Sequence, residues 1–226
     1  MREIPIIFKT PMVLGILNLL KDQTRRLKGL EKINLDPNDW QFEWADFALK
    51  YPWRFTQKSS VNNQSLKDGT FYQEAIKCPY GVVGDILWVR ETWHPKRTNM
   101  PTGWPYEYKA TAEEDGTPTG EPWKPSIHMP KKACRIKLEV INIRVERVRD
   151  ISEEDAKAEG VYFYGWDDPN QDDYKNYLYD DRNSDDWGLL TAWESYSTLW
   201  EKINGKESWN LNPWVWVIKF KIKQID

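Results

Sequence analysis

Apolar and polar residues follow strand periods in some stretches of this chain and helical periods in others. Short apolar runs and alternating positions predict strands, and apolar residues three and four apart predict helices. The expected strands are residues 4–8, 86–90, 133–149 (with a break near Asn142) and 214–222. The expected helices are residues 43–50, 152–160 and 189–203, together with one that begins at Thr10-Pro11. This mixture of elements predicts one domain of the α+β class.

The first helix has a clear start. Thr10 suits its N-cap, and Pro11 suits its first position because the first turn leaves N–H groups unbonded in any case. Apolar side chains at helical spacing then form an inward face, namely Met12, Val13, Ile16, Leu17 and Leu20. Polarity rises abruptly at Lys21, and we expect the helix to run into residues 21–26.

Three long stretches are interpreted as insertions into the single domain that spans residues 1–226. They cover about 28–75, 95–125 and 162–212, and they are rich in aromatic or turn-forming residues. The stretch 162–188 contains eight Asp, which is typical of a solvated surface excursion. For the Trp-rich part at 40–55, both a lid and a simple packing layer remain open.

Composition narrows the possible functions. The chain has 14 Trp, 11 Tyr and 7 Phe, enough for a packed core and for rings that stack on a flat ligand such as a nucleobase. A net charge of −3, from 32 basic and 35 acidic residues, argues against a general nucleic-acid coat protein. A small substrate, or one nucleotide of a larger one, fits better.

The sequence gives little support for a metal site, a cofactor or a membrane-spanning segment. Cys78, Cys134, His94 and His128 have no metal-ligand spacing, and the Asp-rich stretch lacks the calcium-loop pattern, so we expect no metal site and no cofactor. No run of about 18 apolar residues occurs, and the N-terminus lacks the apolar core of a signal peptide. We therefore expect a cytoplasmic protein with two reduced thiols.

Four separated segments, in order along the chain, resemble the ASCH family. They are the Lys21–Arg26 segment with the helix before it, Gly84–Arg90, Asp150–Gly160, and Trp214–Phe220. The resemblance implies a PUA-like fold, which is a mixed β-barrel with helices at its mouth, here enlarged by long aromatic-rich insertions. Residues 123–130 and the insertions are similar to the longer forms encoded by phages and prophages.

Within that family, the closest functional pattern is similar to the small bacterial N4-acetylcytidine amidohydrolases. Their Lys, the Thr three residues later and a Glu in a following short helix match Lys21, Thr24 and Glu159, and their nearby Arg matches Arg26. The resemblance implies an amidohydrolase that removes the N4-acyl group of a small cytidine nucleoside. This chain is about twice as long, which leaves the acyl group and the sugar open.

The implied chemistry sets a condition on the local structure. A Thr hydroxyl needs a base, and a neutral Lys can supply one if burial and neighbouring cations lower its pKa. Lys21 and Thr24 share a side only in a helical or turned backbone, so we expect a helix end or tight turn through 21–24. Glu159 would orient Lys21 or carry the proton, and Arg26 would stabilise the oxyanion. Stacking on the base is expected from an aromatic residue, with Tyr80, Trp88 and Trp93 as candidates.

Other readings remain open. Lys21 and Glu159 could form an ordinary ion pair, with Thr24 bonding backbone at a helix end. The chain could instead be a reader of RNA or of a modified nucleobase without catalysis, with basic residues of 131–149 as a local patch. A nuclease of the same family would need a metal or a histidine pair, which the sequence supports weakly. The oligomeric state is not fixed by the sequence.

Overall fold

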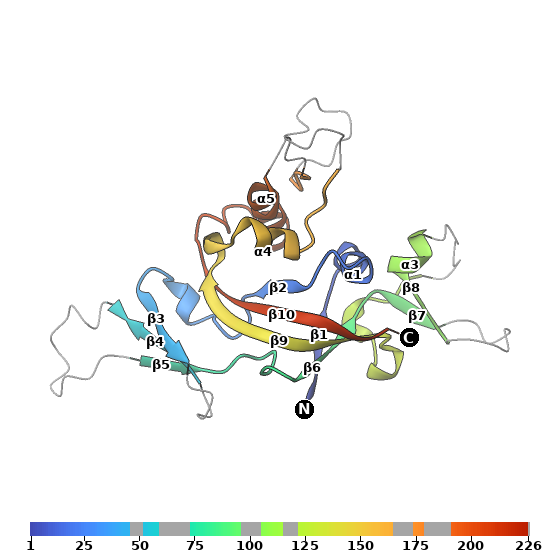
Figure 1. Cartoon of the computed structure of the whole chain (residues 1–226), viewed down its shortest axis with the longest axis horizontal. Helices are drawn as coiled ribbons and strands as arrows, with labels where there is room; N and C mark the ends of the chain where they lie inside the picture. Colours follow the sequence, from blue (N-terminus) through green and yellow to red (C-terminus); the bar gives the residue numbers. More distant parts are fainter. Residues whose placement is uncertain are drawn as a thin grey trace.

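The computed structural model is an α+β protein organised around a long, curved sheet (Figure 1). It describes residues 1–45, 52–58, 73–95, 105–114, 122–164, 174–178 and 191–225. The described strands are β1 Glu3–Ile7, β2 Gln23–Arg26, β3 Trp40–Ala45, β4 Trp53–Gln57, β5 Gln73–Ile76, β6 Ile86–Arg90, β7 Trp93–Pro95, β8 Tyr106–Tyr108, β9 Ile136–Arg147 and β10 Trp214–Ile225. The described α-helices are α1 Thr10–Leu17, α3 Lys109–Glu114, α4 Glu153–Ala158 and α5 Ala192–Asn204.

The main sheet has the order β1-β6-β9-β10-β2, and β1 runs parallel to β6 while the other neighbours are antiparallel. The four strands expected from the sequence are confirmed. The break expected near Asn142 is a bulge within one continuous strand, because Lys219 pairs with Asn142 while the next residue, Phe220, pairs with Val140. Such a bulge bends a long strand without ending it.

Both faces of β10 are covered, which explains its nearly continuous apolar sequence. Trp216, Ile218 and Phe220 belong to the core cluster that includes residues of α1, β1 and β6. The alternate residues Val215 and Val217 belong to a second cluster, with α4 and α5. In Figure 1, α4 and α5 lie together above the β9–β10 pair, and α1 lies to their right.

The two C-terminal helices begin at side-chain caps. The Ser152 hydroxyl accepts a hydrogen bond from the Asp155 N–H at 3.1 Å, and Thr191 forms a full capping box with Glu194. The expected helices at 152–160 and 189–203 are thus confirmed with small changes of boundary. None of the helices in the described ranges has the length and apolarity needed to cross a membrane.

The main sheet does not close into the expected barrel. Its edge strands are β1 and β2, and no backbone ladder joins them in the described part of the chain. The Arg26 side chain connects the two edges instead, because its Nη2 donates to the carbonyl oxygen of Ile7 at 2.8 Å. Thr24 lies in β2, one of these two edge strands.

The first insertion packs on the main sheet through aromatic rings. Its strands form a separate sheet of order β3-β4-β5. Trp53 contacts Trp216 edge-on at 5.0 Å between centroids, and Phe55 contacts Trp214 at 5.3 Å. The helix expected at 43–50 is wrong in its first part, because β3 runs to Ala45, and residues 46–50 lie outside the described residues. Much of the other two insertions (96–104, 115–121, 165–173 and 179–190) also lies outside them.

Candidate active site

A tight turn ends α1 and redirects the chain. Leu19 adopts a left-handed backbone with φ of 59°. Its N–H donates to the Ile16 carbonyl at 3.1 Å, and the Leu20 N–H donates to the Gly15 carbonyl at 2.8 Å. This pair of bonds is a common way of closing a helix at a left-handed residue. Leu20 points outward and is 62% exposed, so its expected place on the inner helix face is wrong.

The expected helix through 21–26 is wrong for the same reason. After the turn, the chain enters β2, which pairs antiparallel with β10. A tight turn was one of the two arrangements expected for residues 21–24. The observed turn lies mainly before Lys21, however, and Thr24 already belongs to strand β2. Lys21 is held at this entry because its N–H donates to the Gly15 carbonyl at 3.0 Å.

Two glycines make room for the Lys21 side chain. A methyl group added to Gly15 would lie 3.3 Å from Lys21 Cβ, and one added to Gly160 would lie 2.9 Å from it. Gly160 also has φ of +78°, which favours glycine. The Lys21 side chain is consequently buried, with 1% of its surface exposed.

The Lys21 ammonium is bound by one residue, Glu159, at the end of α4. Nζ donates to Glu159 Oε2 at 2.7 Å and to the Glu159 carbonyl oxygen at 2.7 Å. The backbone fixes this approach, because the Asp22 N–H donates to the Ala158 carbonyl at 3.1 Å. Residues 138 positions apart are thereby joined in a buried ion pair.

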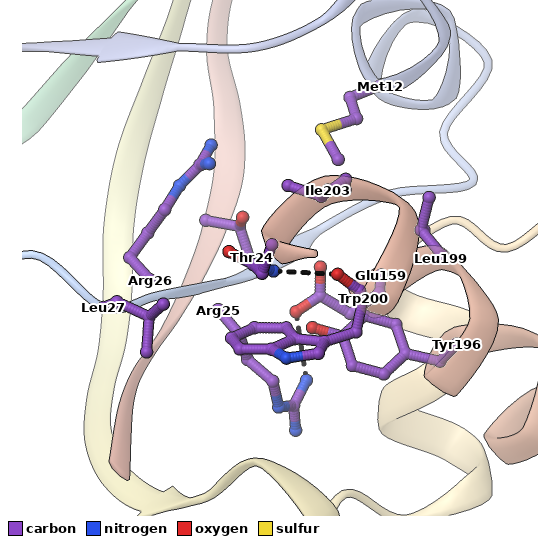
Figure 2. A pocket seen from close by; sticks show the side chains of 11 residues that line it. Met12, Thr24, Arg25, Arg26, Leu27, Glu159, Tyr196, Leu199, Trp200 and Ile203 are labelled. Carbon is purple, nitrogen blue, oxygen red and sulfur yellow. Dashed lines mark hydrogen bonds and ion pairs between the residues drawn. The ribbon is translucent and has the colours of Figure 1, made fainter. Parts of the chain in front are cut away.

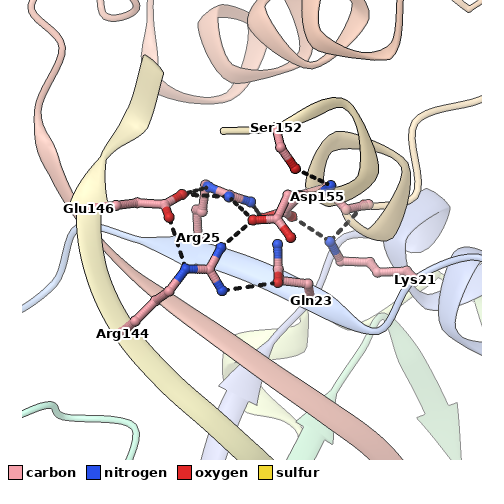
Figure 3. A network of polar contacts seen from close by, with 8 residues as sticks. Lys21, Gln23, Arg25, Arg144, Glu146, Ser152 and Asp155 are labelled. Carbon is pink, nitrogen blue, oxygen red and sulfur yellow. Dashed lines mark hydrogen bonds and ion pairs between the residues drawn. The ribbon is translucent and has the colours of Figure 1, made fainter. Parts of the chain in front are cut away.

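Arg25 holds the other side of Glu159 and links it to two more carboxylates. Its Nη1 donates to Glu159 Oε1 at 3.1 Å, and its Nη2 donates to Glu146 at 2.5 Å and to Asp155 at 3.0 Å. Arg144 binds Glu146 and Asp155 from outside (Figure 3). Arg25, Glu146 and Asp155 were not among the expected site residues, since nothing in their spacing shows that they meet.

This cluster sets the protonation of its members. Burial lowers the pKa of Lys21, although Glu159 opposes the effect; Arg25 and Arg26 lower it further. The pKa of Arg25 is raised, because three neighbouring acidic groups (Glu159, Tyr196 and Glu146) outweigh its burial. Burial alone would raise the pKa of Asp155, but Arg144 and Arg25 lower it. The cluster therefore favours the ionised form of Asp155 and makes Lys21 easier to deprotonate.

A cavity of about 80 Å³ lies beside the cluster. Thr24, Arg26 and Glu159 line it from one side, and α5 covers it with Tyr196 and Trp200 (Figure 2). Lys21 does not line this cavity. Within the described residues its Nζ makes no hydrogen bond to the Thr24 hydroxyl, so its bond to Glu159 is its link to the cavity. Glu159 is thus bonded to Lys21 and lines the same cavity as Thr24.

Arg26 is a cation without a carboxylate partner among the described residues. Its Nη2 is bonded to the Ile7 carbonyl, its guanidinium lies 4.9 Å from the centre of the Phe8 ring, and its buried Nε–H has no acceptor. Burial lowers its pKa, with Tyr80 and Glu159 opposing. A cavity wall with an unpaired cation is suited to an anion or a developing negative charge.

The three expected stacking residues do not line this cavity. Tyr80 is half-buried and interacts electrostatically with Arg26. Trp88 and Trp93 are buried in a separate cluster with Tyr108 and Met129. The rings that do line the cavity are Tyr196 and Trp200. Their spacing of four residues puts them on one face of the helix expected at 189–203, and such a face fits a core position equally well.

A second, larger hollow of about 440 Å³ lies at the start of α1. Lys9 and Lys109 line it together with Thr10, Thr92 and Ser126, and Phe8 forms part of its floor. These cationic and hydroxyl groups suit an anionic ligand. Across the described ranges, no three His, Cys, Asp or Glu side chains gather in a way that could hold a metal.

Comparison with known proteins found no matching family model, no matching curated protein and no matching solved structure. The function of the cavity is therefore inferred from its own residues and from the resemblance that they carry.

Proposed function

We propose that this protein is an amidohydrolase that cleaves the N4-acyl amide of acylated cytidine nucleosides, with Thr24 as nucleophile. One observation carries the proposal: Thr24 and Glu159 share a cavity, and Glu159 is bonded at 2.7 Å to the buried amine of Lys21. An amine whose pKa is lowered by burial loses its proton more readily and is then available as a base.

The reaction has two balanced stages. Thr24 Oγ1 attacks the acyl carbon, and its proton passes to neutral Lys21, directly or through Glu159. The C–N4 bond then breaks, and the departing cytidine amine takes that proton. Water attacks the resulting Thr24 ester and releases the carboxylic acid and free Thr24. Arg26 stabilises the negative oxygen in both stages. The distance between Lys21 and Thr24 has to shorten when the substrate binds, as catalytic contacts often do.

The size of the cavity limits which part of the substrate is enclosed. Pockets that surround a whole small ligand measure roughly 300–1,000 Å³, whereas this one measures about 80 Å³. The acyl amide and one edge of the base would lie inside, and the sugar outside. We also propose that the fold is PUA-like, with its barrel left open between β1 and β2. The strand order leaves these two strands at the edges of the sheet, and the Arg26–Ile7 hydrogen bond between them supports an open form of the barrel.

The experiment follows ultraviolet absorbance of N4-acetylcytidine, and of a bulkier N4-acylcytidine, with the wild type, Thr24→Ala and Lys21→Ala. We expect the wild type to form cytidine and both variants to lose this activity. Circular dichroism would check that each variant is folded. No conversion of any acyl substrate by folded wild type would overturn the proposal.

A second candidate function is binding of RNA or of a modified nucleobase without catalysis. Two observations favour it: Lys21 bonds Glu159 rather than Thr24, and the hollow beside Lys9 and Lys109 suits phosphate. A reader would bind an acetylcytidine-containing oligonucleotide in a salt-dependent way and leave it intact. Replacing Lys9 and Lys109 by Ala would then weaken binding, whereas Thr24→Ala would not.

A further inference from the structure

Two residues that line the cavity have buried N–H donors with no acceptor in the described part of the chain. One donor is the Nε–H of Arg26, already considered for the oxyanion. The other is the indole N–H of Trp200, a residue only 3% exposed. A buried donor without a partner costs about 1–3 kcal/mol, so such groups are rare in native proteins. Both residues line the same cavity, which suggests that a ligand supplies the missing acceptors.

The two donors lie at different places around Glu159. In Figure 2, the Arg26 side chain points away from Trp200, on the far side of Thr24. The Trp200 indole lies on the other side of the Glu159 carboxylate. Two different acceptor atoms of a ligand would satisfy them. Arg26 is placed for the oxygen of the group that Thr24 attacks, and Trp200 for a second acceptor farther along the ligand.

The contacts of Trp200 keep its ring in place without using its N–H. It follows Tyr196 by one helical turn, their ring centres are 6.3 Å apart, and its backbone carbonyl accepts from Asn204 at 3.0 Å. In contrast, the buried indole of Trp216 donates to the Lys28 carbonyl at 3.1 Å. The indole N–H of Trp93 also has no partner among the residues that the structure describes, but Trp93 lines neither described cavity. This difference makes Trp93 a matched control.

We infer that Trp200 is a substrate-binding residue whose indole N–H donates to the acceptor edge of the pyrimidine, formed by O2 and N3. The inference rests on the proposed function and extends it: the acyl oxygen binds at Arg26 and the base edge at Trp200. It also gives α5, which lies in an insertion, a direct part in specificity. A ligand with an N-acyl group but no ring acceptor would leave this donor unsatisfied.

The first test uses indole N–H resonances in the Thr24→Ala variant, where substrate is not consumed. Of the 14 Trp signals, the one lost in a Trp200→Phe spectrum belongs to Trp200. We expect N4-acetylcytidine to shift this resonance downfield and acetanilide, which has no ring acceptor, to leave it in place. An equal response to both compounds, or none to acetylcytidine, overturns the inference.

The second test compares kinetics of Trp200→Phe and Trp93→Phe. Loss of one neutral hydrogen bond is expected to raise KM about tenfold with little change in kcat. Trp93→Phe should leave both constants within about twofold, since that N–H meets no ligand. Hydrolysis by the wild type without a Trp200 shift would overturn the role of Trp200 alone. A Trp200 shift without any hydrolysis would overturn the proposed reaction and support the acceptor site, and absence of both would overturn both.

Discussion

Two buried clusters of charged residues differ in whether they border a cavity, and this difference separates a structural ion pair from a proposed functional site. Glu91 and Arg135 form a closed pair, with Arg135 Nε and Nη2 donating to the two carboxylate oxygens at 2.9 Å each. Thr111 accepts a further bond, and the Arg135 guanidinium lies 4.1 Å from the Tyr108 ring centre. This pair lines neither described cavity.

The Lys21–Arg25–Glu159 cluster is equally buried but not closed. It lies at a cavity wall, where Arg26 adds a cation with an unused N–H donor and no carboxylate partner among the described residues. The comparison teaches that a buried ion pair alone is weak evidence for a site. Excess charge and unused donors at a cavity wall are stronger evidence, because only a ligand would complete them.

The largest expected effect is the loss of hydrolysis in Lys21→Arg. Arginine keeps the positive charge opposite Glu159, but it cannot lose a proton at accessible pH. We expect the rate to fall by roughly 100-fold or more, the usual contribution of a general base. The matched change Arg135→Lys in the closed pair should leave the rate unchanged. A Lys21→Arg variant with the wild-type rate would show that Lys21 acts only as a charge.

The next prediction concerns stability, for which we expect the larger effect in the Glu91–Arg135 pair. Arg135→Met leaves Glu91 buried without a cation, which costs roughly 3–5 kcal/mol in comparable pairs. Lys21→Met should cost less, because Glu159 remains bonded to Arg25. Urea denaturation of both variants measures the difference. Equal losses would mean that Arg25 does not support Glu159 as the structure indicates.

The pH dependence should also differ between the clusters. Burial lowers the pKa of Lys21 below its ordinary 10.5, so hydrolysis should increase as pH rises through that lowered value. The stability associated with Lys21 is present above pH 10.5 and is lost as pH falls through the lowered pKa. For Glu91, burial raises the pKa above its ordinary 4.5 despite Arg135, so its contribution is present below 4.5 and is lost as pH rises through the raised value.

Rate profiles of the wild type, and stability profiles compared with Lys21→Met and Glu91→Gln, check these signs. A rate that is flat with pH, or that falls as pH rises in the range where Lys21 loses its proton, would contradict the role of a neutral Lys21.

The smallest effect tests how closely Lys21 is packed. Gly160→Ala and Gly84→Ala both place a side chain at positive φ, of 78° and 88°, and each should cost about 1–2 kcal/mol. Only the Gly160 methyl would meet Lys21, since nothing lies within 4 Å of the one at Gly84. We expect a lower rate in Gly160→Ala alone. Equal rates in the two variants would show that the position of Lys21 tolerates this displacement.

The strands were predictable because their apolar patterns are strong and local. The end of α1 was not, because the left-handed residue is Leu19, and leucine gives no signal for such a backbone. Leu20 continued the helical spacing and so extended the predicted helix too far. The open edge between β1 and β2 depends on pairing across distant parts of the chain, which local patterns do not report.

The site was predictable only in part. Lys21, Thr24 and Glu159 were named through the family resemblance, and the structure bonds Lys21 to Glu159 and puts Thr24 and Glu159 at one cavity. Arg25 gave no signal, because its three carboxylate partners lie 121 to 134 residues away. Trp200 showed helical spacing, but that pattern cannot distinguish a ring that fills the core from one that lines a cavity.

The most direct test of the central claim is to look for the acyl group on Thr24. A slowly cleaved N4-acylcytidine would be mixed with the protein, quenched with acid during the first turnover, and mapped by peptide mass spectrometry. We expect one acyl group on the peptide that contains Thr24, and none on that peptide in Thr24→Ala, which should also fail to form cytidine. An acyl group on another residue, or cytidine formation by Thr24→Ala at the wild-type rate, would contradict the claim.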